Sequence, residues 1–137
     1  MIIFLISELN IKGGTHKQFL KMLEYTDKQN IDFKVITSHL DLKNTYPGFE
    51  KFKNKITVVQ MKKGRYLVSK VLNHFIYFYA LKNAISKADI INIHDGGFEK
   101  YLGAFRGKKV FWQVNDLHQC FNEGVSNSVK KSFVSQR

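Results

Sequence analysis

Three short stretches of the sequence combine residue types that can bind or act on a phosphorylated or hydroxylated ligand. They are Gly13-Gly14, His94-Asp95-Gly96-Gly97 and Asn115-Asp116-Leu117-His118. Each follows a run of apolar residues that predicts a β-strand. Parallel strands end at the same edge of a sheet, and that edge is where α/β proteins bind ligands. We therefore expect the loops over residues 8–15, 94–98 and 115–119 to border one cleft.

The Gly13-Gly14 pair stands between an apolar run and a helical pattern. Without Cβ atoms the backbone can approach a ligand closely, and the N-terminus of the following helix offers free N–H groups to an anion such as a phosphate. The pair belongs to neither G-x-G-x-x-G nor the Walker pattern. A tight turn that needs glycine for a positive φ explains the pair equally well, so both interpretations stay open.

His94 and Asp116 are the candidate catalytic residues. His94 stands at the end of a predicted strand, and an imidazole there can bond a sugar hydroxyl or titrate near neutral pH. Asp116 follows the next strand and is placed for acid–base work or hydroxyl recognition. The alternatives are a structural hydrogen bond for His94 and an Asx turn at Asn115 and Asp116. No His or Cys pair has ligand spacing, so we expect no metal site.

The elements that must position these residues alternate between strands and helices. Apolar and β-branched runs predict strands at residues 2–7, 31–37, 55–61, 88–94 and 109–114, and helical spacing predicts helices at residues 15–30 and 66–87. Thr15 and Gln18 have the spacing of a capping box, and Tyr46-Pro47-Gly48 signals a turn. This order predicts an α/β fold, a Rossmann-like three-layer sandwich with a mainly parallel sheet, over residues 1–137.

The sequence has 22 Lys and Arg residues against 11 Asp and Glu residues, for a formal net charge of +11. This balance is compatible with an anionic partner, namely nucleic acid, anionic lipid or a phosphorylated ligand, and equally with a lysine-rich solvated surface. Beyond charge nothing indicates a nucleic-acid-binding module, and we expect none. A basic stretch that includes Lys62, Lys63, Arg65 and Lys70 runs into the aromatic helix, and the two together suit an anionic membrane surface. The alternative is that the aromatic residues pack on the sheet and the lysines are merely solvated.

Other features narrow the class of protein. The uncharged stretch over residues 71–81 is too short to cross a bilayer, and the apolar residues 2–7 predict a strand, not a signal peptide. The single cysteine, Cys120, permits no internal disulfide, so we expect a cytoplasmic protein, peripheral at the inner face of the cell membrane if the basic stretch binds lipid.

At the three loops the sequence resembles the N-terminal domain of family 4 glycosyltransferases, retaining enzymes of GT-B fold. The matching pieces are residues 2–6 followed by Lys12-Gly13-Gly14, residues 88–94, and residues 110–116. The resemblance implies that Gly13 and Gly14 border the diphosphate of a nucleotide sugar. It also implies that His94 faces the transferred sugar and that Asp116 lies in the cleft.

The resemblance implies that this chain is the acceptor-binding half of a glycosyltransferase. A complete enzyme would move a sugar from a nucleotide sugar to a glycan or lipid-linked acceptor, as in polysaccharide biosynthesis, without a metal, because backbone amides and basic side chains meet the charge of the leaving group. The family's donor-binding domain, with its Glu-x7-Glu motif, is absent from these 137 residues. We expect that domain on a longer chain or a separate one, and no activity from this chain alone.

Two other functions remain open. One is a non-catalytic basic α/β module that docks on an anionic membrane or on a partner protein. The other is a Rossmann-type nucleotide binder of different chemistry, which the missing G-x-G-x-x-G disfavours.

Overall fold

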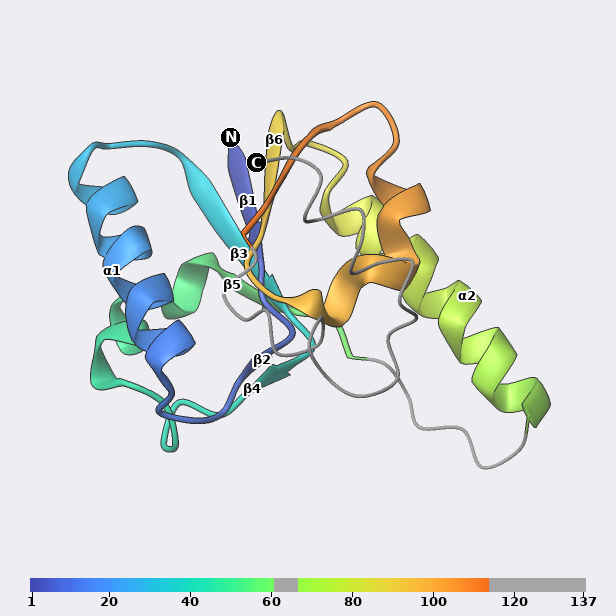
Figure 1. The fold of residues 1–137 in the computed structure, drawn as a ribbon, viewed down its shortest axis with the longest axis horizontal. Helices are drawn as coiled ribbons and strands as arrows, with labels where there is room; N and C mark the ends of the chain where they lie inside the picture. The colour runs from blue at the N-terminus through green and yellow to red at the C-terminus, as the bar shows by residue number, and fades with distance from the viewer. Residues whose placement is uncertain (61–66, 114–137) are drawn as a thin grey trace, which may run out of the picture.

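The computed structural model describes residues 1–60 and 67–113 and shows an α/β protein (Figure 1). Its centre is a five-stranded sheet in the order β5-β3-β1-β6-β7, with every pair parallel. The strands are β1 (Ile2–Leu5), β3 (Phe33–Thr37), β5 (Ile56–Val58), β6 (Ile90–Ile93) and β7 (Lys109–Trp112). The predicted α/β class, parallel sheet and five strands are confirmed.

Helices cover both faces of the sheet and make three layers, with α1 on one side and α2 on the other (Figure 1). The first layer holds α1 (Gly14–Lys28) and the 3₁₀ segment η1 (Pro47–Lys55), and the third holds α2 (Leu67–Ala84) and the 3₁₀ segment η2 (Gly96–Phe105). Successive strand residues point to opposite faces. Phe4 therefore packs against Phe19 of α1, while Ile3 and Leu5 belong to the cluster that includes Leu81 of α2.

The central strand β1 is where the winding of the chain reverses. From β1 the chain runs through α1 to β3 on one side and later returns to β6 on the other side, so Leu5 pairs with both Ile36 and Ile93. In open parallel sheets a crevice forms at the carboxyl ends of the strands beside such a reversal. The loops that follow β1 and β6 occupy this position.

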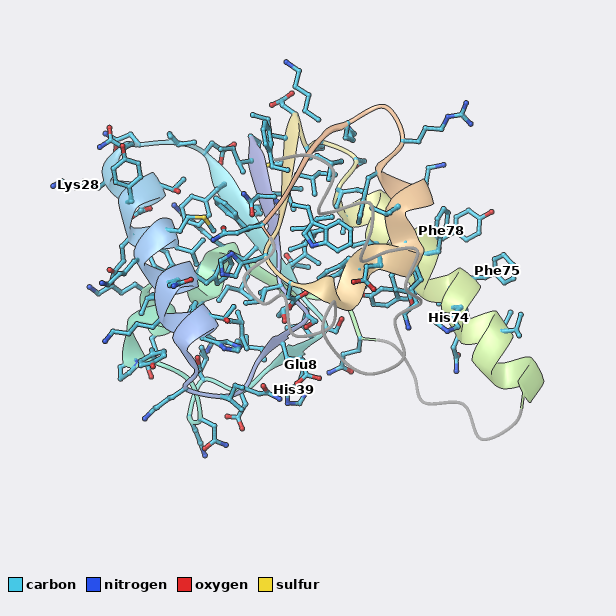
Figure 2. The ribbon with its side chains drawn as sticks, viewed as in Figure 1. Glu8, Lys28, His39, His74, Phe75 and Phe78 are labelled. Atoms are coloured by element: carbon cyan, nitrogen blue, oxygen red, sulfur yellow. The ribbon has the colours of Figure 1, made fainter. Side chains whose placement is uncertain are left out.

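A second, two-stranded sheet extends the same edge and was not expected from the sequence. Its strands β2 (Glu8–Leu9) and β4 (His39–Leu40) follow β1 and β3 closely and pair in parallel. Figure 2 labels Glu8 and His39 at this sheet. Strands of two residues are too short to show the alternation of apolar and polar positions from which strands are predicted.

Two local expectations, and one of the two alternatives for the aromatic helix, differ from the structure. Helix α1 begins at Gly14 with Gly13 as its N-cap and has no side-chain cap, because the first helical hydrogen bond joins Lys17 N–H to the Gly13 carbonyl and leaves Thr15 inside the helix. Pro47 does not close a simple turn but occupies the start of η1. The aromatic helix α2 does not pack all its aromatic residues on the sheet, since Phe75 and Tyr79 are 60% and 65% exposed.

Candidate functional site

The structure brings the Gly13-Gly14 turn and His94 together at the carboxyl edge of the sheet. The backbone N–H of His94 donates to the Leu5 carbonyl over 2.8 Å, as a continuation of the β1–β6 ladder. Its ring Nε2 lies 3.3 Å from the Thr15 carbonyl, in the first turn of α1. A carbonyl only accepts, so Nε2 carries the proton in this contact. The predicted convergence of these two loops is therefore observed.

His94 is almost completely buried, with 1% of its surface exposed. Its ring packs on Phe19 of α1 with 4.7 Å between ring centroids. Burial lowers the pKa of His94, while the Thr15 carbonyl and the side chain of Gln113 act in the opposite direction. Burial is the largest of these effects, so the imidazole is neutral at pH 7 and serves as a hydrogen-bond donor.

Gly13 and Gly14 do not form the tight turn with positive φ that was one of the two interpretations of the sequence. Gly13 has a φ of −107°, and Gly107 is the one described glycine with a positive φ. A Cβ on Gly14 would meet nothing within 4 Å, so neither backbone conformation nor packing requires glycine there. The first turn of α1 also contains no acidic side chain. The positive end of the helix dipole is thus exposed beside a position that leaves room for a ligand.

Asp95 has a structural task that the sequence did not reveal. Its carboxylate accepts hydrogen bonds from the backbone N–H and the hydroxyl of Ser7, each at 2.6 Å, and from the backbone N–H of Gly97 at 3.2 Å. It therefore caps η2 and ties the segment after β6 to the end of β1. A Cβ on Gly97 would lie 2.7 Å from the Ser7 Cβ, so this close approach needs glycine.

Gln113 is a further residue of the site that the sequence analysis missed. It is the first residue after β7, where its backbone N–H donates to the Ile93 carbonyl over 2.8 Å, and its side chain acts on His94. The carboxyl ends of β1, β6 and β7 thus all meet at His94. Gln113 falls inside the predicted strand over residues 109–114, and only the structure, in which β7 ends at Trp112, shows that Gln113 follows the strand.

The structure does not describe the side chains of several residues that the sequence analysis singled out. Asp116, Lys62, Lys63 and Arg65 lie outside the described residues, and Lys70 lies in α2 at a position whose side chain is not described. Within residues 1–60 and 67–113, no three His, Cys, Asp or Glu side chains are grouped so that they could hold a metal ion. No helix in these two ranges is long and apolar enough to cross a membrane.

Fold and site together define a Rossmann-like α/β domain. At the point where the winding of its sheet reverses, the N-terminus of α1 is left uncovered by Gly14, and the imidazole of His94 is buried beside it. Comparisons with known protein families, with curated proteins and with solved structures give no match to this chain. The class of fold therefore rests on the structure.

Proposed function

We propose that this chain is the acceptor-side half of a retaining glycosyltransferase that uses a nucleotide sugar as donor. The observation that carries the proposal is the position of Gly14, which leaves the N-terminus of α1 open at the reversal point, within one residue of the carbonyl that His94 contacts. Residues 2–6, 12–14 and 88–94, which carry the resemblance to family 4 glycosyltransferases, form β1, the Gly13-Gly14 turn and the strand before His94.

In this proposal the chain contributes electrostatic stabilisation and positioning. The free N–H groups and helix dipole at Gly14 stabilise the charge that develops on the departing diphosphate, so the reaction needs no metal. His94 is neutral and donates through Nε2. Because His94 is 1% exposed, its ring would orient the transferred sugar only after the Thr15 carbonyl is displaced and the ring is uncovered to a sugar hydroxyl. The nucleoside is held by a donor-binding domain on a longer or a second chain, and the acceptor is a glycan or a lipid-linked glycan in the cytoplasm.

The test joins residues 1–137 to the donor-binding domain of a GT-B enzyme and supplies radiolabelled nucleotide sugars with membrane and soluble acceptors. Transfer is expected for the joined protein and none for the chain alone. Gly14→Ala should lower turnover on the order of tenfold, because the added methyl group occupies the space in which the diphosphate approaches the backbone. Gly103→Ala is the matched control, because a Cβ there makes only an ordinary contact, 3.6 Å from Phe78.

His94→Gln retains a side-chain N–H donor and tests the imidazole separately. The proposal expects a clear loss of turnover in a variant that is still folded by circular dichroism. Folded joined protein that transfers no sugar from any donor would refute the proposed function. Full turnover in both variants would remove the Gly14 turn and His94 from the site.

A further inference from the structure

Helix α2 has two apolar faces, of which only one belongs to the core. Tyr77 and Leu81 of α2, and Ile85 directly after its end, are spaced four residues apart and are buried in the core cluster on the sheet. The opposite face is half or more exposed and consists of Val71, Leu72, Phe75, Ile76 and Tyr79, at 50%, 57%, 60%, 54% and 65%. We call these five residues the α2 patch. Their spacing makes one continuous stripe on the helix, unlike the scattered apolar residues of an ordinary surface.

The α2 patch extends along a part of the helix that projects past the sheet (Figure 1). None of residues 71–76 is buried. Phe75 points away from the sheet, on the side of the molecule opposite Lys28 (Figure 2). Between α2 and η2 the patch borders an open hollow of about 430 Å³, lined by Val71, His74, Phe75, Phe78, Tyr79 and Tyr101 and with the Lys100 side chain also on its wall. His74 Nδ1 and the Tyr101 hydroxyl are 2.8 Å apart in that wall.

Cations border this apolar surface near the C-terminal end of α2 and along η2, where Lys100 lines the first hollow. A second hollow of about 380 Å³ shares Tyr79 with the first and is lined by Lys82, Arg106 and Lys108. Among residues 1–60 and 67–113, no acidic residue lines either hollow, and α2 contains neither Asp nor Glu. An exposed aromatic stripe with a cationic border complements the interface of an anionic bilayer, where aromatic rings enter between head groups and Lys and Arg contact the phosphates.

We propose that the α2 patch docks this protein on an anionic phospholipid surface, with Phe75 and Tyr79 inserted at the interface and Lys82, Lys100 and Arg106 on the head groups. A second copy of the chain is a poorer occupant, because a two-fold interface would bring the same cations face to face. The inference does not rest on the proposed sugar transfer, since binding to lipid requires neither donor nor acceptor.

The test is sedimentation of the full chain with vesicles of phosphatidylcholine, with or without phosphatidylglycerol. We expect binding to the anionic vesicles that weakens as salt is raised, because salt screens the head-group charge. Equal binding to both vesicle types, or no binding to either, would overturn the proposal.

Matched variants locate the surface. Tyr79→Ser should weaken partition on the order of tenfold through the loss of the inserted ring. Tyr25→Ser on α1 is its control, because Tyr25 is also 65% exposed. Lys82→Gln should weaken partition about fivefold. Lys28→Gln is its control, because both lysines stand in the last turn of their helices.

The outcomes separate the candidate partners. Losses in the α2 variants and not in their α1 controls support the proposal. If the α2 variant and its α1 control lose vesicle binding equally, the lipid contact lies elsewhere on the protein and the proposal is overturned. A concentration-dependent dimer that Tyr79→Ser abolishes, without vesicle binding, would assign the α2 patch to a second copy and likewise overturn it. Circular dichroism verifies that each variant is folded.

Discussion

At the scale of single residues, His94 is held from several directions at once. Its backbone continues the β1–β6 ladder, its ring packs on Phe19, and its Nε2 lies against the Thr15 carbonyl. Such a buried imidazole must stay neutral for the fold to keep its full stability. The same neutrality suits a donor to a sugar hydroxyl.

We predict that the protein loses stability in weak acid because of His94. Burial lowers the pKa of His94, so the unfolded chain takes up this proton at a higher pH than the folded chain does. The neutral His94 ring therefore makes its full contribution to the free energy of unfolding above the pKa of the unfolded state, about 6.5, and this contribution is lost as the pH falls through the pKa of the folded state. Urea unfolding from about pH 7 to about pH 5 should show a smaller loss for His94→Gln than for the wild type. The control His39→Gln removes an exposed imidazole, and an equal change in both variants would contradict the assignment.

A second residue-scale prediction concerns Gly97, where η2 approaches β1. Gly97→Ala should lower the free energy of unfolding by about 1–3 kcal/mol, because the new Cβ would lie 2.7 Å from the Ser7 Cβ. Gly103→Ala, also in η2, should change it by less than about 0.5 kcal/mol. Chemical denaturation of the two variants checks this, and equal stabilities would show that the approach of η2 to Ser7 relaxes freely.

At the scale of elements, α2 is apolar on nearly all sides although it covers the sheet with one face only. A helix of this composition is usually enclosed by the protein. Here the residues after Ile76 reach the sheet, while the preceding turns project past it (Figure 1). The uncovered turns are the ones for which we propose a lipid surface.

The two faces of α2 should respond differently to the same substitution. Leu81→Ala removes a fully buried side chain and should lower the free energy of unfolding by about 2–5 kcal/mol. Leu72→Ala, at a position 57% exposed, should change it by less than about 0.5 kcal/mol. Urea unfolding measures both. A large loss in Leu72→Ala would mean that the outer face is covered within the folded chain.

At the scale of the whole molecule, the two proposed surfaces lie in different layers, because α1 and α2 stand on opposite sides of the central sheet (Figure 1). The site is at the carboxyl edge of the sheet, and the projecting turns of α2 extend toward the end of the molecule that carries the small sheet (Figure 1).

The sequence by itself determined the α/β class, the five strands and the common edge of Gly13-Gly14 and His94. Near-continuous apolar runs and helical spacing are local patterns, and parallel strands necessarily end together. Only the tertiary structure decided which face of α2 is buried, because apolar residues on both faces leave the pattern undecided. The tertiary structure also decided three features of the site: the burial of His94, the Asp95–Ser7 contact and the role of Gln113. Each of these joins residues distant in the chain, whose distances are set by packing.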